Sequence, residues 1–92
     1  MTNHGSMAVR GYITVEVRPG TAPQVKPTIE SWRDKTNVNI ESCDIVASDE
    51  GNEIMVVLEA PTNKDFGVFV MHKLQYIEGV VRTASKLVIS EF

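Results

Sequence analysis

The stretch Asp65–Ile89 reads DFGVFVMHKLQYIEGVVRTASKLVI and contains the signals of a helix, a turn and a strand in succession. In its first half, apolar side chains recur at the spacing of one buried face of a helix: Phe66, Phe69, Val70, Leu74 and Ile77. Lys73 lies at the edge of this face. Gly79 is typical of a helix end, because glycine takes a left-handed conformation without steric cost. The spacing therefore predicts a helix over residues 66–77 and a strand over residues 80–89.

The segment before this helix predicts where the helix starts. Residues 61–65 read PTNKD, in which Thr62 and Asp65 have nearly the spacing of a capping box. An acid in the first turn is also favoured by the helix dipole. Further back, residues 54–58 read IMVVL and are apolar in both phases of a strand, which predicts a central strand with both faces covered.

Two more strands are predicted from alternating apolar residues. Residues 9–17 alternate cleanly, whereas in residues 39–47 the alternation changes phase, which predicts a β-bulge near Ser42. The polar residues 48–52, SDEGN, predict a hairpin turn into the third strand.

The first helix is less regular. Val25, Ile29 and Trp32 fall at helical spacing, and Thr21 stands where an N-cap is expected. Because prolines at positions 23 and 27 suit only a first turn, we predict that the regular helix begins near Lys26.

The resulting element order, βαββαβ, predicts an α+β, ferredoxin-like fold of the dimeric α/β-barrel type. Two helices pack on one face of a four-stranded antiparallel sheet, with the first and third strands in the middle. The opposite face then carries Tyr12, Met55 and Val57 without cover from the chain itself. A second copy is the simplest cover, so we expect a homodimer or a larger ring.

Composition narrows the function. The 92 residues suffice for one domain, which we place at residues 8–92, after a leader at residues 1–7 that is disordered or artificially added. A net charge of −3 without a basic cluster disfavours nucleic acid as a direct partner, and no apolar run is long enough for a membrane span. The single cysteine, Cys43, fits a reducing cytoplasm.

Candidate chemical groups are sparse. His72 lies off the apolar stripe, and a catalytic role would need an acid and a nucleophile nearby, so an exposed or interface histidine is the simpler interpretation. Cys43 is expected to behave as a small apolar residue, and His4 lies in the leader. We expect no cofactor and no metal, because His4, Cys43 and His72 share no ligand spacing. The predicted turn contains three acids, Asp49, Glu50 and Glu53. Together with Asp65 they form either a solvated surface or a cluster that binds an amine.

Several motifs together resemble the C-terminal effector domain of the leucine-responsive (Lrp/AsnC) regulators. They are DFGxFV from Asp65, KLQxIxGV from Lys73, TxSxxVI from Thr83 and YxxVxVxPG from Tyr12. The resemblance extends from Val9 to Phe92. The sequence before it is too short for the helix-turn-helix of those regulators, so the chain resembles the stand-alone form, the RAM domain.

The resemblance implies a protomer that dimerises through its sheet and assembles into rings, with amino acids bound between dimers. Expected partners are a second copy, an amino acid and a full-length regulator of that family. The family's binding segments correspond here to Ser48, Asp49, Gly51, Asn52, Glu53, Thr83 and Ser85. This sequence departs from the family in two places. Residues 50–53 read EGNE where the family has Gly-x-x-Asp, so the glycine is displaced and the acid is longer. The segment at residues 36–44 is also several residues longer than the corresponding segment of the family.

Two alternatives remain open at this point. The small nitrate-reductase maturation chaperones, which bind a twin-arginine signal peptide, share the βαββαβ order and similar VVLEA and EGV segments. The second alternative is a small enzyme of the dimeric α/β-barrel type that uses His72 in catalysis.

Overall fold

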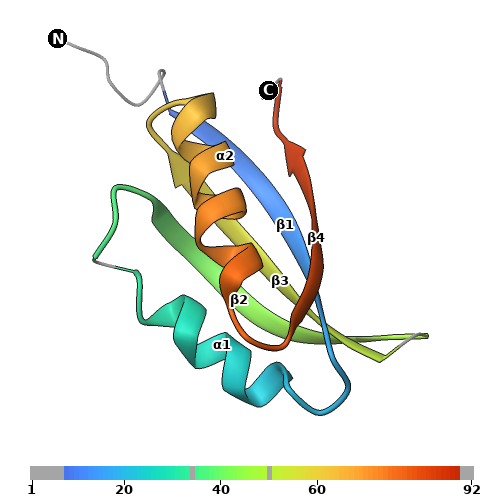
Figure 1. Cartoon of the computed structure of the whole chain (residues 1–92). Helices are drawn as coiled ribbons and strands as arrows, with labels where there is room; N and C mark the ends of the chain where they lie inside the picture. Colours follow the sequence, from blue (N-terminus) through green and yellow to red (C-terminus); the bar gives the residue numbers. More distant parts are fainter. Residues whose placement is uncertain (1–7, 34, 50, 90–92) are drawn as a thin grey trace, which may run out of the picture.

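The computed structural model describes residues 8–33, 35–49 and 51–89. The expected leader at residues 1–7 lies outside them. Seven elements follow one another along the chain (Figure 1). They are β1 (Val9–Val17), α1 (Ala22–Glu30), β2 (Asn39–Ser48), β3 (Gly51–Ala60), α2 (Asn63–His72), the short 3₁₀ helix η2 (Leu74–Tyr76) and β4 (Val80–Leu87).

The strands form one antiparallel sheet in the order β2-β3-β1-β4. Both helices lie on the same face of this sheet, and β1 and β3 occupy its centre (Figure 1). This confirms the predicted ferredoxin-like fold and the positions of its strands.

The core lies between the sheet and the helices. On the central strands, every second residue points towards the helices and is buried, as expected from the period of two. The buried strand residues include Ile13, Val15, Ile54, Val56 and Leu58. Phe66 and Phe69 of α2 and Leu74 of η2 close the core on the helix side, and no polar or charged residue is buried among the described residues.

The bulge in β2 falls where the phase change predicts it. Ile40 pairs with Leu58 and Ser42 pairs with Val57, so Glu41 is the extra residue. The insertion turns Cys43 towards the core, where it is 4% exposed.

The first helix starts earlier than expected. It begins at Ala22, not near Lys26, and ends at Glu30, so Pro23 lies in its first turn and Pro27 inside it. Thr21 precedes the helix, but its side chain does not cap it, because its hydroxyl donates to the Arg18 carbonyl at 2.7 Å.

The second helix starts as predicted and ends early. The Asp65 amide donates to Thr62 Oγ1 at 3.0 Å, which confirms the cap. The α-helix stops at His72, because Lys73 has non-helical angles (φ −121°, ψ −64°), and η2 continues the path. The expected single helix over residues 66–77 is therefore two pieces, with Leu74 still fully buried after the break.

The ends of the third and fourth strands also differ from the prediction. β3 is longer than residues 54–58 at both ends, because its pairing continues to Gly51 in the hairpin and to Ala60 opposite Val9 of β1. β4 ends at Leu87 instead of Ile89, although the Val88 amide still donates to the Arg10 carbonyl at 2.9 Å. Gly79 precedes β4 with φ +102°, in agreement with its expected role as the end of the helical segment.

Candidate functional site

Four of the seven expected binding residues surround one small hollow at the base of the β2–β3 hairpin. Its volume is about 250 Å³. The expected residues in its lining are Ser48, Gly51, Asn52 and Glu53, and the others are Glu16, Val17, Arg18, Pro19 and Val81. The hollow, which we call the hairpin hollow, thus combines the turn with the end of β1 and the start of β4.

The other three expected residues lie elsewhere. Asp49 is exposed in the turn but does not line the hollow. Thr83 and Ser85 pair with the core residues Val15 and Ile13, so they lie on the helix-covered side of the sheet at its β4 edge. Thr83 accepts a hydrogen bond from Gln75 Nε2 at 3.2 Å. The structure does not bring these three residues into the hollow.

The hairpin hollow holds more negative than positive charge on its sheet side. Glu16 of β1 and Glu53 of β3 are directly opposite each other in the register. Arg82 Nε lies 2.7 Å from Glu16 Oε1, whereas Glu53 has no ion pair with any residue that the structure describes. Like charges in this arrangement repel, so a further cationic group between the two strands is favoured.

Arg18 supplies a cation on the other wall of the hollow. Its guanidinium is 3.9 Å from Glu78, and both side chains are largely exposed, so this contact holds it only weakly. Ser48 is committed to the turn, because its hydroxyl donates to the Gly51 carbonyl at 2.7 Å. Gly51 has φ +123°, which a residue with a side chain rarely adopts.

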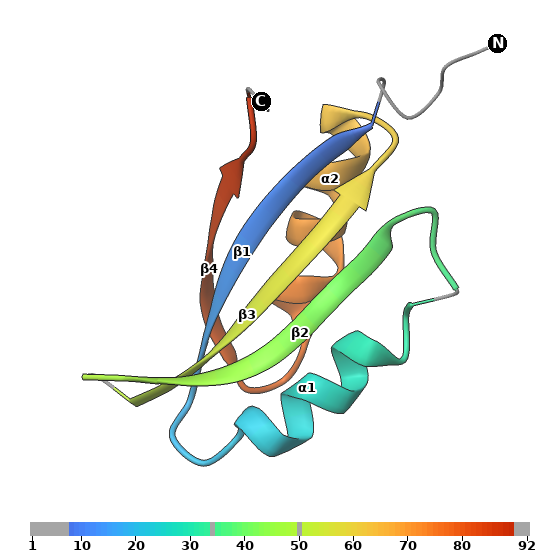
Figure 2. The same cartoon turned by 180° about the vertical axis from the view of Figure 1, so that it is seen from behind.

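None of the helices and strands that the structure describes covers the sheet face opposite the helices (Figure 2). We call it the open face. Tyr12 and Val57 are cross-strand neighbours at its centre, and Met55 lies beside them with its sulfur 3.2 Å from Thr14 Oγ1. Tyr12 is 38% exposed, while Met55 and Val57 are half-buried. The three residues thus lie on the face where the sequence places them.

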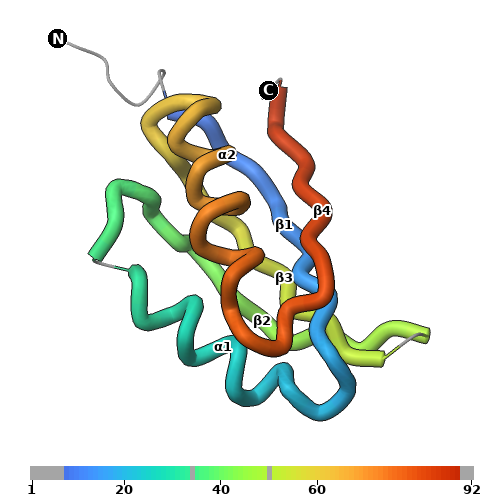
Figure 3. The backbone as a smooth tube through the Cα atoms, viewed as in Figure 1, coloured from blue at the N-terminus to red at the C-terminus, as the bar shows by residue number. Residues whose placement is uncertain are grey.

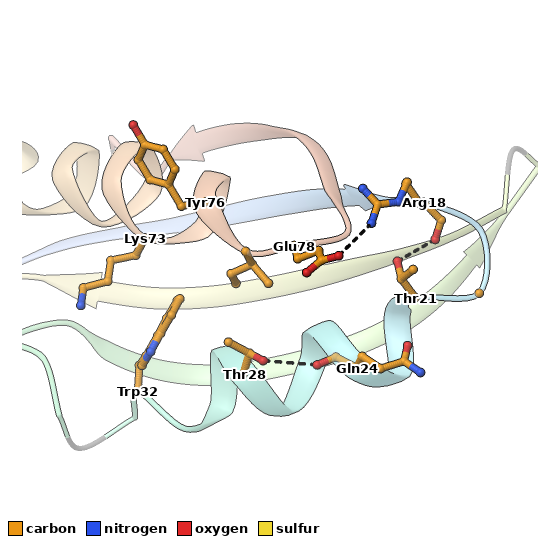
Figure 4. Close-up of a pocket in the computed structure, with 10 residues that line it drawn as sticks. Arg18, Thr21, Gln24, Thr28, Trp32, Lys73, Tyr76 and Glu78 are labelled. Atoms are coloured by element: carbon orange, nitrogen blue, oxygen red, sulfur yellow. Dashed lines mark hydrogen bonds and ion pairs between the residues drawn. The ribbon is translucent and has the colours of Figure 1, made fainter.

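A second, larger cavity lies on the helix side of the sheet, meets the hairpin hollow at Arg18 and was not predicted. It is a groove between α1 and the segment around η2, with a volume of about 630 Å³ (Figure 4). Its lining consists of Arg18, Gly20, Thr21, Gln24, Thr28, Trp32, Lys73, Tyr76, Ile77 and Glu78. We call it the helix groove. The sequence contains one signal for this groove. Two large aromatic residues, Trp32 and Tyr76, lie at the margins of the apolar faces predicted for the first and second helices.

The groups considered for catalysis are not assembled. His72 is exposed at the end of α2 and makes no side-chain hydrogen bond within the described part of the chain. Burial raises the pKa of Cys43 to about 11, so its thiol is neutral, as expected of a core residue. Among residues 8–33, 35–49 and 51–89, no group of histidine, cysteine and acidic side chains has a metal-binding arrangement.

The acids of the predicted amine-binding cluster are also separated. Asp65 lies in the first turn of α2, and this end of α2 is at the opposite end of the sheet from the β2–β3 turn (Figure 3). Glu50 lies outside the described residues. Glu53 is therefore joined by Glu16, not by Asp65.

The described helices include none with the length and apolar character needed to cross a membrane.

Comparison with known proteins gives no matching family model and no matching curated protein. Solved structures do match. FFRP-DM1 has a TM-score of 0.70 at 18% identity, over 88% of this chain and 99% of that one.

Two longer proteins share the fold as well. MtbAldR has a TM-score of 0.72 at 15% identity, over 100% of this chain and 59% of its own. A transcriptional regulator from Neisseria meningitidis, solved as a complex with L-Met, has a TM-score of 0.67 at 19% identity, over 99% and 57%. This chain therefore spans less than two thirds of either protein. At these identities the likeness establishes the fold, which is the one that the resemblance to effector domains implies.

Proposed function

We propose that this chain is a non-enzymatic regulatory domain that binds a free amino acid in the hairpin hollow and dimerises through its open face. The observation that carries the proposal is the pair of opposed carboxylates, Glu16 and Glu53, with Arg82 as the one cation paired to them in the described residues. An α-ammonium group supplies the missing positive charge.

The same hollow offers a partner for the other end of an amino acid. Arg18 lines the hollow and is held only by a 3.9 Å contact to Glu78, so it is available to a carboxylate. A volume of about 250 Å³ suits a single amino acid better than a peptide. The structural likeness to a regulator in complex with L-Met supports the same ligand class.

Dimerisation is supported by the open face. Its apolar centre at Tyr12, Met55 and Val57 lies between an acid on the β2 edge, Asp44, and two bases on the β4 edge, Arg82 and Lys86. A two-fold stack of two such sheets removes the apolar centre from water. The proposed regulatory mechanism is population shift, because a ligand stabilises the assembly that binds it best. A full-length regulator with the same fold is the proposed partner for mixed assembly.

The assembly is tested by light scattering at micromolar concentration on the unmodified chain and on Val57→Lys. We expect a dimer or larger species for the first and a monomer for the second, because a lysine at the centre of the interface would lose its hydration. Val68→Lys is the matched control, since Val68 is 44% exposed on α2 and lies away from the open face. A monomeric unmodified chain contradicts the proposal.

The ligand is tested by a thermal-shift screen of the common amino acids. A ligand at a hundred times its Kd adds about 2.7 kcal/mol to the free energy of unfolding, which is readily detected. Glu53→Gln should remove the shift, whereas Glu59→Gln should preserve it, because Glu59 lies on the same face of β3 at the far end from the hairpin. Absence of any shift, together with tight binding of a twin-arginine peptide, would favour the chaperone alternative.

A further inference from the structure

The helix groove lies on the helix side of the sheet and shares one lining residue, Arg18, with the hairpin hollow, so the two proposed ligands would compete for this guanidinium. Its inner surface is apolar where α1 ends. Trp32 is half-buried there and packs edge-on against Phe69, with ring centroids 5.8 Å apart and an interplanar angle of 87°. Ile77 faces the same space, and Tyr76 stands at its margin with 77% of its surface exposed (Figure 4).

The groove carries positive charge at both ends, in a chain whose net charge is −3. Lys73 Nζ lies 5.5 Å from the centroid of the Trp32 ring and has no carboxylate within 4.0 Å in the described residues. Arg18 lies at the other end, near Thr21 and Gln24, and Glu78 contacts it at 3.9 Å (Figure 4). The lining thus contains two cations and one acid, and this acid is 94% exposed and free to move away.

Backbone amides offer little to an anion at this site. The start of α1 faces the Arg18 end of the groove, but Pro23 has no N–H. The amides of Gln24 and Val25 both donate to the Thr21 carbonyl at 3.0 Å. Recognition of an anion therefore depends on the guanidinium of Arg18 and, at longer range, on the ammonium of Lys73.

We propose that the helix groove binds an amphiphilic carboxylate. Its apolar body lies along Trp32 and Ile77, and its carboxylate pairs with Arg18 in place of Glu78. A volume of about 630 Å³ is far larger than an amino acid needs and lies within the range of sites for larger organic molecules. The cations disfavour a neutral lipid, and the volume exceeds what a single amino acid fills.

The test is a titration of the full chain with decanoate below its micelle concentration, followed by the fluorescence of Trp32, the single tryptophan in the sequence. We expect a saturable change in Trp32 emission. Decanol, which has the same chain without the charge, should bind at least about tenfold more weakly, because it lacks the ion pair with Arg18. Equal binding of decanol and decanoate would overturn the proposal.

Three variants locate the site. Glu78→Gln should tighten decanoate binding by about two- to fivefold, because it removes the competing carboxylate from Arg18. Lys73→Gln should weaken it by a similar factor, and Thr28→Phe should abolish it by filling the groove. All three positions are exposed, so folding is retained and is checked by circular dichroism.

Glu53→Gln separates this proposal from the amino-acid site. This residue lines the hairpin hollow but not the helix groove, so decanoate binding should remain unchanged in that variant. Loss of decanoate binding in Glu53→Gln, or unchanged binding in both Glu78→Gln and Thr28→Phe, would overturn the groove as the site. Because Arg18 lines both sites, the effect of Glu53→Gln, and not a change at Arg18, distinguishes the two proposals.

Discussion

Gly11 of β1 lies directly under the ring of Phe66 of α2, so close that a Cβ atom at position 11 would overlap the Cε2 and Cζ atoms of the ring. The same Cβ would be 3.0 Å from the Lys86 carbonyl oxygen. Phe66 is buried in the core, where it is 3% exposed. This contact sets the distance between the second helix and the centre of the sheet.

Gly11→Ala is therefore expected to lower the free energy of unfolding by about 1–3 kcal/mol, as overpacking of a core does. Urea unfolding followed by circular dichroism measures the change. Gly67→Ala is the matched control. A Cβ at Gly67 meets nothing within 4 Å, and the position is helical, so this variant should gain about 0.5–1 kcal/mol. Equal effects of the two variants would show that Phe66 does not fix the spacing.

Pro27 offers a route to a more stable first helix. It lies inside α1, where its ring nitrogen has no hydrogen to donate to the Pro23 carbonyl. Pro27→Ala restores that donor but loses the restriction that proline places on the unfolded chain. We expect a net gain of about 1–2 kcal/mol in the free energy of unfolding, measured with urea.

Pro23→Ala is the control for this prediction. Pro23 lies in the first turn, where a missing N–H costs nothing, and it is as exposed as Pro27. Its replacement should change stability by less than about 0.5 kcal/mol. A loss of stability in Pro27→Ala would mean that the proline is favourable in this helix.

The sequence predicts the sheet better than the helices because strand burial repeats every two residues and is visible over short segments. The phase change around Ser42 even locates the bulge, one residue away at Glu41. The helix boundaries are set by longer-range packing. Burial of Val25 and Ile29 keeps the first helix intact across Pro27, and Leu74 stays in the core although the helix has already broken at Lys73.

The candidate sites divide in the same way. Ser48, Gly51, Asn52 and Glu53 are neighbours along the chain, so sequence reasoning could group them. It could not pair Glu53 with Glu16, because this proximity depends on the register between β1 and β3. The helix groove was also beyond prediction, since it arises from how two helices are spaced on the sheet and not from any local motif.

Cys43 makes stability depend on pH above neutrality. Burial, followed by the nearby Glu30 carboxylate, raises the pKa of the Cys43 thiol from its ordinary value of 9.0 to about 11 in the folded chain. The unfolded chain therefore loses this proton first, and unfolding is favoured as pH rises from 9.0 to about 11. Below that range the group has no effect on the pH dependence.

The expected loss across this range is up to about 2–3 kcal/mol. It is measured by urea unfolding at several pH values, with Cys43→Ala as the reference, because other groups titrate alike in both proteins. The thiol should also react slowly with a disulfide reagent at pH 8 and rapidly in urea. Parallel pH profiles for the two proteins would contradict the raised pKa.

Glu53 should show opposite effects on stability and on ligand binding. In the chain without ligand it faces Glu16 across the strands, and like charges in that position destabilise the sheet. Glu53→Gln removes the repulsion, so the free energy of unfolding should rise by a few tenths of a kcal/mol, to about 1 kcal/mol at most. The same change removes the carboxylate that we assign to the ligand's ammonium group, so the stabilisation by amino acid should disappear.

Salt distinguishes this explanation from a general improvement in packing. Partly exposed charges are screened at high ionic strength. The difference in the free energy of unfolding between Glu53→Gln and the unmodified chain should therefore shrink between about 0.05 and about 1 M NaCl. These concentrations vary the screening length from more than about 10 Å to about 3 Å. Glu59→Gln, on the same strand and face but opposite Arg10, should show no gain. If Glu53→Gln instead lowers stability at low salt, the carboxylate is already satisfied within the chain, and the hairpin hollow has no unmet charge for an amino acid to balance.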